Sequence, residues 1–337
     1  MGDRTGEVEG MGLRIYLTGA TGAVGIGVVE ECIRRGFQVT ALVRPGSARV
    51  SHLPVSDLVE VRECALADMQ KVADVSSLPL IQGKIPGKVQ GSTSQAAFIH
   101  LGWEGTIGGG REDEDLQRRN VEYTLDAVRL AARLGCKAFV GAGSQAEYGR
   151  PGDTPLRPET PCHPENAYGR AKLEAGRKSA DLCAQLGLTQ VWPRILSVYG
   201  PGDGERTLIS TVIRALLAGE KPALTAGEQM WDYLYSTDAG RALVLLAERA
   251  CADHALHGRI YPLGSGQVRP LREYVEELRN AAFPGVELGF GEIPYGEKQV
   301  MYLQADISAL RQDVGFTPEV DFSDGIARTI AWRKEHR

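Results

Sequence analysis

The sequence contains no long hydrophobic run, no basic block and no internal repeat. No stretch reaches the about 20 apolar residues of a membrane-spanning helix, and residues 1–10 are polar and acidic, unlike a secretory signal. The net charge is −5, so neither a nucleic acid nor an anionic membrane is expected as a partner. These absences predict a cytoplasmic protein whose partner is a small molecule.

The six cysteines include no Cys-x-x-Cys pair and no spacing typical of metal ligands. Most of them lie in apolar patterns, where a free thiol acts as a small hydrophobic side chain. This usage is typical of a reducing compartment, and we predict no metal site. The 337 residues, of which 43% are hydrophobic, can bury a large core without disulfides or metals.

From Leu13 onward, short β-rich runs alternate with longer segments of helical period, which predicts an α/β fold with a doubly wound parallel sheet. The strands are expected at residues 13–18, 37–43, 58–64, 96–101, 137–141 and 190–196. The helices between them are expected at residues 24–35, 113–134 and 166–186. Residues 72–95 are rich in Gly, Ser, Pro and Lys, so a short helix and a mobile loop are expected there.

After residue 200 the expected elements are shorter. They are helices at residues 208–217, 237–250, 271–282, 306–313 and 324–336, and a strand at residues 286–290. The sequence thus predicts a disordered leader (1–12), a Rossmann dinucleotide-binding domain with the catalytic residues (13–200), and a part (201–337) that is mainly a smaller α/β substrate-binding lobe. Some segments of this last part are expected to return to the Rossmann domain.

Three glycines, Gly19, Gly22 and Gly25, lie between the first predicted strand and the first predicted helix. Without side chains, they let the backbone approach a pyrophosphate held at the helix N-terminus. A tight turn that needs positive φ would also explain a glycine triplet. The strand-turn-helix context favours dinucleotide binding.

The end of the second predicted strand bears on the choice of cofactor. An NAD site places an acidic residue there, whereas this chain has Val43 and then Arg44, with Arg49 nearby. A guanidinium suits the 2′-phosphate of NADP, although Arg44 can also be a solvated surface residue. We therefore predict NADP(H), with NAD(H) as the second choice. Asp68 and Met69 either contact the edge of the adenine ring or have no cofactor role, Asp68 being a carboxylate in a loop and Met69 a core residue.

Tyr168 and Lys172 are four residues apart, so they share one face of the predicted helix. There the ammonium group can lower the pKa of the phenol. An exposed helix face is the alternative explanation for such a pair. The position favours chemistry, because Ser144 follows a sheet strand just upstream and enters the cleft that such sheets use for ligands.

Further landmarks accompany these residues and extend over about residues 13–332. Together they resemble extended short-chain dehydrogenases/reductases of the NAD-dependent epimerase/dehydratase family, which act on nucleotide sugars. The landmarks are Thr18-Gly-Ala-Thr-Gly-Ala-Val-Gly25, His100-Leu-Gly-Trp103, Asn120, Gly143-Ser-Gln-Ala-Glu-Tyr-Gly149, Tyr168 with Lys172, Pro193-Arg-Ile-Leu-Ser-Val-Tyr-Gly-Pro-Gly-Asp203, Trp231-Asp-Tyr-Leu-Tyr235 and Asp306-Ile-Ser-Ala-Leu310.

The resemblance implies a role for each matching residue. Ser144 polarises the sugar oxygen, Tyr168 donates or accepts the proton, and Lys172 holds the nicotinamide ribose and tunes Tyr168. Asn120 supports the proton relay. The expected cofactor contacts are Gly19, Thr21, Gly22, Ala23, Val24, Gly25, Arg44, Asp68, Met69, Leu101, Gly102, Trp103, Asn120, Tyr168, Lys172, Ile195 and Leu196. The expected substrate contacts are Trp103, Gln145, Asn166, Ser197, Arg206 and Trp231. Trp103 either walls the sugar pocket or packs its own loop, and a homodimer is expected.

Two departures from the family pattern affect the expected reaction. Family dehydratases carry an Asp-Glu pair after the active-site hydroxyl, whereas this chain has Gln145 and Ala146, which cannot act as general acid or base. Many members grip the diphosphate with an arginine at the position of Trp231. Arg206 or Lys298 must then contact the diphosphate, if the substrate carries one.

The motif Gly143-Ser-Gln-Ala-Glu-Tyr-Gly149, together with the Trp231-Asp-Tyr segment, resembles the corresponding motifs of 4-keto-6-deoxy-sugar reductases of the CDP-abequose synthase type. We therefore predict an NADP(H)-dependent reductase of a nucleotide-linked 4-keto hexose. A 4-epimerase with retained NAD is the first alternative, and a non-catalytic NADP-binding sensor is the second. The sequence leaves the sugar, the nucleotide, the product stereochemistry and the oligomeric state open.

Overall fold

The computed structural model describes residues 12–82 and 95–336. The leader predicted for residues 1–12 therefore lies almost entirely outside the described residues, as does most of the loop predicted up to residue 95. No helix in the described ranges is long and apolar enough to cross a membrane.

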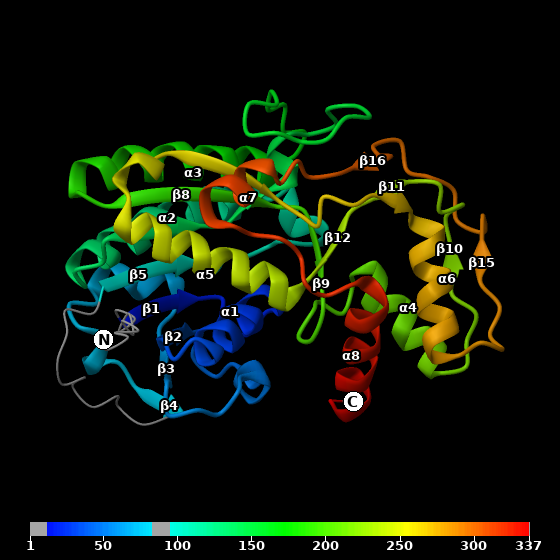
Figure 1. Cartoon of the computed structure of the whole chain (residues 1–337), viewed down its shortest axis with the longest axis horizontal. Helices are drawn as coiled ribbons and strands as arrows, with labels where there is room; N and C mark the ends of the chain where they lie inside the picture. Colours follow the sequence, from blue (N-terminus) through cyan, green and yellow to red (C-terminus); the bar gives the residue numbers. More distant parts are fainter. Residues whose placement is uncertain (1–11, 83–94, 337) are drawn as a thin grey trace, which may run out of the picture.

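One large sheet dominates the fold (Figure 1). Its strands run in the spatial order β13-β8-β6-β5-β1-β2-β3-β4, and β7 pairs with the end of β8. All pairings are parallel except β3 with β4, which is antiparallel. The predicted α/β fold with a parallel, Rossmann-like sheet is confirmed. The strands are β1 (Leu13–Thr18), β2 (Gln38–Val43), β3 (Val59–Glu63), β4 (Leu80–Gln82), β5 (Gln95–His100), β6 (Ala138–Gly141), β7 (Gly143–Ser144), β8 (Thr189–Ile195) and β13 (Arg259–Leu263).

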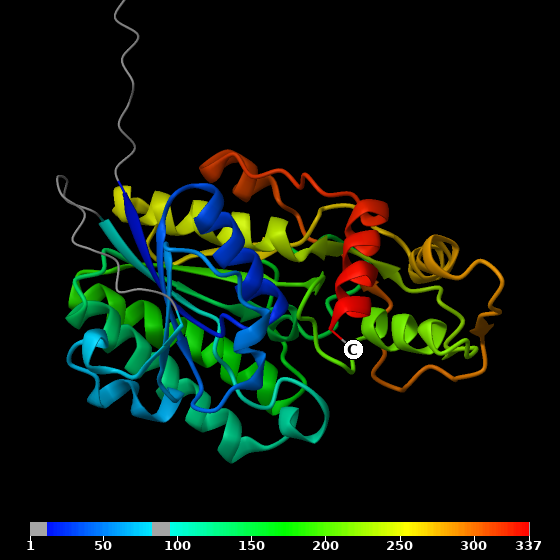
Figure 2. The same cartoon turned by 90° about the horizontal axis from the view of Figure 1, so that it is seen from below.

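Helices cover both faces of this sheet (Figure 2). On one face α1 (Ala23–Arg34) packs against α5 (Ser236–Ala252), and on the other α2 (Glu114–Arg133) packs against α3 (Ala167–Leu186). The α1–α5 crossing needs Gly27 and Gly240, because a Cβ on either would collide with the backbone of the other helix. Although both follow residue 200 in sequence, β13 is a strand of the large sheet and α5 packs on its face.

Most of the remaining elements gather at the carboxyl end of the sheet, where they have an apolar core of their own. The predicted helices at 208–217 and 271–282 occur with those bounds, as α4 (Leu208–Leu217) and α6 (Leu271–Ala282). The division into two domains at residue 200 stays a prediction. The other elements here are β9 (Ser197–Tyr199), β10 (Ala223–Leu224), β11 (Met230–Trp231), β12 (Tyr233–Tyr235), β14 (Arg269–Pro270), β15 (Gly289–Phe290), β16 (Tyr302–Leu303) and α8 (Phe322–Glu335). Helix α7 (Ser308–Val314) instead packs on α5, and its Leu310 belongs to the core of the large sheet.

The region after β3 differs from the sequence prediction. The short helix expected there is replaced by two 3₁₀ helices, Leu66–Lys71 and Val75–Ser77, and by the edge strand β4. The expected strand at residues 286–290 shortens to the two residues of β15. Strand β4 lies at the outer edge of the sheet, and its apolar side chains, Leu80 and Ile81, are both exposed. Its three residues therefore do not alternate between buried apolar and exposed polar side chains, which is the pattern that predicts a strand.

Candidate active site

A cleft of about 360 Å³ opens at the carboxyl ends of β1, β5, β6 and β8, where parallel sheets bind ligands. It brings together the three predicted catalytic residues, most of the glycine motif and part of the loop after β9. The lining residues are Gly19, Gly22, Ala23, Val24, Gly25, Arg49, Leu101, Trp103, Thr106, Ala142, Gly143, Ser144, Tyr168, Lys172, Ile195, Val198, Gly202, Asp203 and Gly204. Thr21, Gly102 and Leu196 belong to the segments that form the cleft but do not line it.

The glycine motif forms a tight turn with open space above it. Gly19 has a φ of +72°, and a Cβ on Gly25 would collide with the carbonyl oxygen of Gly19. Above Gly22, by contrast, the nearest heavy atom to such a Cβ is that same oxygen at 3.8 Å. No side chain caps the N-terminus of α1. The free first-turn amides and the room above Gly22 fit the pyrophosphate of a nicotinamide dinucleotide.

Ser144 is fixed at the start of a 3₁₀ helix by the buried carboxylate of Glu147. The backbone amide of Ser144 donates to Glu147 Oε1 (2.8 Å), while the Ser144 hydroxyl oxygen accepts from the amide of Ala146 (3.2 Å). Glu147 also accepts from Arg194 Nε (2.6 Å) and from Trp192 Nε1 (3.1 Å). This paired carboxylate orients the serine.

Asn166 places the Tyr168–Lys172 pair by capping α3, because its Oδ1 accepts from the amide of Gly169 (2.8 Å). Lys172 Nζ donates to the carbonyl oxygen of Ala142 (2.7 Å) and lies 3.7 Å from the ring centroid of Trp103. It is 5.8 Å from the ring centroid of Tyr168. Burial lowers the pKa of Lys172 to about 7, against the opposing effect of Glu147.

Tyr168 is buried beside a hydroxyl and a guanidinium. Burial raises the pKa of its phenol, whereas hydrogen bonding with Ser144 and the positive charge of Arg111 lower it. Arg111 lies over the phenol ring, with Cζ 4.3 Å from the ring centroid. Trp103 meets the same ring edge-on at 6.1 Å. The sequence reasoning did not identify Arg111, which follows a glycine run that matches no motif.

The 103–111 loop is tied to α2 by two buried amides. Trp103 Nε1 donates to Gln117 Oε1 (2.8 Å). Asn120 accepts from the amide of Glu104 and donates to its carbonyl oxygen, both at 2.9 Å. The structure thus places Asn120, expected in the proton relay and at the cofactor, as an anchor of this loop outside the cleft lining.

His100, at the end of β5, is a buried structural residue. Its Nδ1 lies 2.8 Å from Thr18 Oγ1, and its Nε2 lies 3.4 Å from Thr124 Oγ1. Burial and the nearby Lys172 charge lower the pKa of His100 to about 3, so the imidazole is neutral at physiological pH.

The arginine that faces the cleft is Arg49 rather than Arg44. Arg44 is exposed and does not line the cleft, because Gly46, with a φ of +67°, turns the chain back into the 3₁₀ helix Ala48–His52. Asp68 is likewise 53% exposed and pairs with Lys71 Nζ at 2.8 Å. Met69 is buried in the core. The structure therefore does not bring Arg44, Asp68 and Met69 to the cleft.

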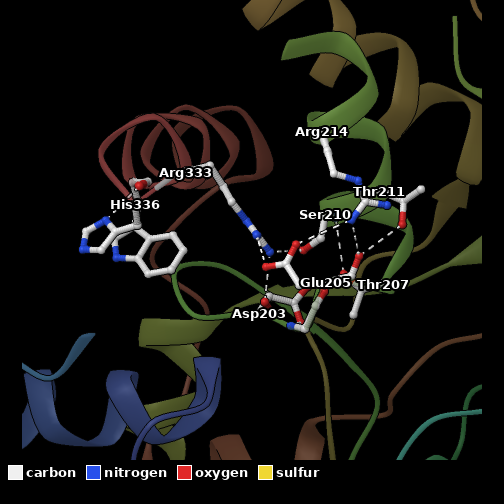
Figure 3. Close-up of polar contacts among 10 residues, drawn as sticks. Asp203, Glu205, Thr207, Ser210, Thr211, Arg214, Arg333 and His336 are labelled. Atoms are coloured by element: carbon white, nitrogen blue, oxygen red, sulfur yellow. Dashed lines mark hydrogen bonds and ion pairs between the residues drawn. The ribbon is translucent and has the colours of Figure 1, made fainter. Parts of the chain in front are cut away.

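The opposite rim of the cleft is the 200–207 loop, which α8 holds in place (Figure 3). Asp203 accepts from the Thr207 hydroxyl (2.6 Å), and Arg333 Nη2 donates to the Asp203 carbonyl oxygen (2.9 Å) and to Ser210 Oγ (2.7 Å). Arg333 Nη1 also pairs with Glu205. In the sequence, only the Pro-Gly-Asp turn and Arg206 pointed to this rim, and nothing pointed to Arg333.

Of the predicted substrate residues, Ser197, Arg206 and Trp231 lie on the side of the small elements, whereas Trp103, Gln145 and Asn166 lie on the side of the large sheet. Trp231 Nε1 donates to Ser197 Oγ (2.8 Å), and Trp231 lines an apolar cavity of about 310 Å³. Gln145 is half-buried next to Ser144. Arg206 is exposed, and a Cβ on Gly108 would lie 3.6 Å from its Nη1, so the two loops meet at the mouth of the cleft. Within the described ranges, no three His, Cys, Asp or Glu residues group as metal ligands.

Known proteins with similar sequences or folds catalyse related reactions. The chain is 28% identical to a dTDP-glucose 4,6-dehydratase of Streptomyces griseus, over 72% of this chain and 73% of the relative. It is 26% identical to a dTDP-6-deoxy-L-talose 4-dehydrogenase (NAD(+)) of Aggregatibacter actinomycetemcomitans, over 79% of this chain and 89% of the relative.

Among solved structures, a UDP-N-acetylglucosamine 4-epimerase from Methanobrevibacter ruminantium M1, in complex with UDP-N-acetylmuramic acid, shares the fold. The TM-score is 0.80 at 20% identity, covering 96% of this chain and 99% of that one. The model of the NAD dependent epimerase/dehydratase family matches residues 15–264. The chain therefore belongs to this family, and it is an enzyme of the extended short-chain dehydrogenase/reductase type.

Proposed function

We propose that this enzyme reduces the 4-keto group of a nucleotide-linked 6-deoxy hexose with NADP(H). The observation that carries the proposal is the convergence of Ser144, Tyr168 and Lys172 on one cleft, next to positions 145 and 146 that hold no titratable group. A ketone reduction needs one hydride and one proton, and this set of residues can place both. The similarity to a sugar 4-dehydrogenase supports chemistry at that carbon.

The protein residues bind the ketone and deliver the proton. The hydroxyls of Ser144 and Tyr168 donate hydrogen bonds to the ketone oxygen, and Tyr168 gives up its proton as negative charge develops there. Lys172 contributes positive charge and a donor for the ribose of the cofactor. The bound nicotinamide supplies the hydride.

Dehydration needs an extra acid and base near Ser144. Gln145 and Ala146 supply neither, and the nearest carboxylate, Glu147, is fully buried and bonded to Arg194 and Trp192. A carboxylate committed to these partners cannot move a proton on the sugar. This argues against the dehydratase reaction of the S. griseus relative.

The proposed preference for NADPH over NADH depends on the edge of the cleft formed by the 3₁₀ helix Ala48–His52. Arg49 lines the cleft, and β2 ends in Val43 where an acid would favour NAD. A guanidinium there can pair with the 2′-phosphate of NADP. We expect Arg49→Ala to reduce the kcat/KM ratio of NADPH over NADH, and Arg44→Ala, its exposed neighbour, to change this ratio less.

The apolar cavity beside Trp231 suits the flat base of a nucleotide. None of the described residues that line it is charged, so the diphosphate must be held elsewhere. Arg206, at the mouth of the cleft, is the candidate for that contact. The predicted homodimer and cytoplasmic location remain predictions.

The test is to supply a dTDP- or CDP-linked 4-keto-6-deoxy hexose with NADPH or NADH and to follow the nicotinamide absorbance. One nicotinamide oxidised per sugar reduced is expected, and the parent hexose nucleotide with NAD should give no keto product. A keto-deoxy product from the parent hexose would make the enzyme a dehydratase. Interconversion of 4-epimers without net cofactor use would make it an epimerase.

A further inference from the structure

Besides Ser144 and Lys172, the arginine Arg111 contacts the phenol of Tyr168. Its guanidinium lies over the ring face, with Cζ 4.3 Å from the centroid, which is cation–π geometry. Its Nη1 also donates to the carbonyl oxygen of Thr106 (3.2 Å) within the same loop. Arg111 is half-buried, so solvent screens its charge only in part.

The 103–111 loop is built to hold this arginine in place. The Gln117 side chain donates to the carbonyl oxygens of Gly105 (3.1 Å) and Gly110 (2.7 Å), one on each arm of the loop. A Cβ on Gly110 would lie 2.7 Å from the Cα of Gly105, so the arms touch. Gln117 is 1% exposed, and its other end accepts from Trp103. One buried amide thus closes the loop that ends in Arg111.

Lys172 is less well placed than Arg111 to stabilise charge on the phenol. Its Nζ packs on Trp103 and donates to Ala142, 5.8 Å from the Tyr168 ring centroid. With a pKa of about 7, it carries only part of its charge near neutral pH. Arginine stays fully charged at every physiological pH.

We propose that Arg111 is a positioning residue for the reaction, which supplies the permanent positive charge beside the Tyr168 phenol. When the phenol gives up its proton, the guanidinium stabilises the phenolate that remains. Within residues 12–82 and 95–336, the other polar or charged groups that act on Tyr168 or its neighbour Lys172 are Ser144, Glu147 and His100, and the imidazole of His100 is neutral. The assignment of Tyr168 as proton donor rests on the proposed function, whereas the contact between the two side chains does not.

The test measures the ionisation of position 168 without substrate or cofactor. Tyr168 is replaced by 3-fluorotyrosine, whose phenol is more acidic than that of tyrosine, and its pKa is followed by fluorine NMR. With Arg111→Gln we expect this pKa to rise by about one unit, because a cation within 4–6 Å typically shifts a neighbouring acid by about 1–3 units. Arg111→Lys, which keeps the charge, should restore most of the original value.

Arg118→Gln is the matched control. It removes the same charge from an exposed position on α2, where Arg118 pairs with Asp115. An equal pKa in wild type and Arg111→Gln, or an equal rise in both glutamine variants, would overturn the proposal. If Arg111→Gln lowers the melting temperature, the pKa is measured instead in Arg111→Met, which keeps an aliphatic chain over the ring. An unchanged pKa in that variant, or an equal rise in the control, would overturn the proposal in the same way.

Kinetics separate this role from substrate binding. In the reduction of a 4-keto-6-deoxy nucleotide sugar, the alkaline limb of kcat/KM should move to higher pH in Arg111→Gln by the same amount as the NMR pKa. A higher KM with no change in either pKa would make Arg111 a substrate contact and contradict the proposal. Absence of turnover by the wild type would refute the proposed function, while the NMR result would still decide the role of Arg111.

Discussion

The two loops that border the cleft are held by different chemistry. The 103–111 loop is anchored by the neutral amides of Gln117 and Asn120, which are buried on the next helix. The 200–207 loop is anchored by the guanidinium of Arg333, which lies 130 positions from Asp203 in sequence. Buried amide bonds depend little on salt, whereas the pair of Arg333 with the 60% exposed Glu205 is screened and weak by itself. We therefore expect the 103–111 loop to be rigid and the 200–207 loop to loosen more easily.

Of the two loops, the rigid 103–111 loop is expected to give the larger effect. Gln117→Ala should lower the free energy of unfolding by about 1–3 kcal/mol, because buried carbonyl oxygens lose their donor. It should also lower kcat about 10²-fold, because Trp103 and Arg111 lose their positions beside Tyr168. Thermal unfolding and steady-state kinetics measure the two effects, with the exposed neighbour Arg118→Ala as control. An unchanged kcat would show that this loop does not position the site.

Arg333→Ala should act on cofactor binding rather than on chemistry. Because Arg333 orients the rim at Asp203, we expect the Kd of NADPH to rise about tenfold, which corresponds to about 1.4 kcal/mol, with little change of kcat at saturating cofactor. Arg333→Lys should restore only part of the affinity, since lysine lacks the planar fork. Fluorescence titration measures Kd, and the exposed Lys334→Ala is the control. A large drop in kcat with unchanged Kd would reverse the roles of the two loops.

Salt should separate the two anchors further. Raising the salt concentration from about 0.1 M to about 1 M should reduce the difference in melting temperature between wild type and Arg333→Ala, because salt screens the ion pair of the wild type and the variant has no such pair to lose. The corresponding difference for Gln117→Ala should stay nearly constant. Equal salt responses of the two differences would contradict the distinction between a charged and an uncharged anchor.

The smallest expected effect concerns pH. The ring of His52 meets the rings of Trp332 and His336, at the end of α8, edge-on, with centroid distances of 5.0 Å to Trp332 and 5.5 Å to His336. Burial, then the nearby charges of Arg49, His336 and Arg333, lower the pKa of His52 below 6.5. Below pH 6.5 the unfolded chain therefore binds a proton that the folded chain binds less well, so stability falls as the pH drops.

The variant His52→Phe keeps an aromatic ring in this contact but cannot titrate. We expect its melting temperature to fall less than that of wild type as the pH drops through 6.5. The same decrease in both proteins would assign the pH dependence to other groups, with the buried His100 as the first candidate.

The sequence predicted the sheet and its main helices because each has a strong local pattern. The α4 and α6 helices have the predicted bounds, since apolar residues recur at helical spacing between clear breakers. Strand β4 was missed because three residues at the sheet edge carry no periodic signal. The two-residue strands around β11 form through pairing with distant segments, which local pattern does not show.

The residues of the candidate site likewise fall into those that a local motif predicts and those that only tertiary contacts place. Gly22, Ser144, Tyr168 and Lys172 belong to motifs whose spacing shows their chemistry, and the structure gathers them in one cleft. Arg111 and Arg333 carry no such signal, because their partners are set by tertiary contacts 57 and 130 positions away. Their positions follow from how the loops are held, which the sequence alone does not predict.

The most direct test of the account is the turnover of Tyr168→Phe. Deleting one hydroxyl should lower kcat/KM for ketone reduction by about 10²–10⁴-fold, the usual contribution of a positioned acid, while the Kd of NADPH stays close to that of wild type. Retention of more than about a tenth of wild-type turnover would contradict the assignment of Tyr168 as the proton donor.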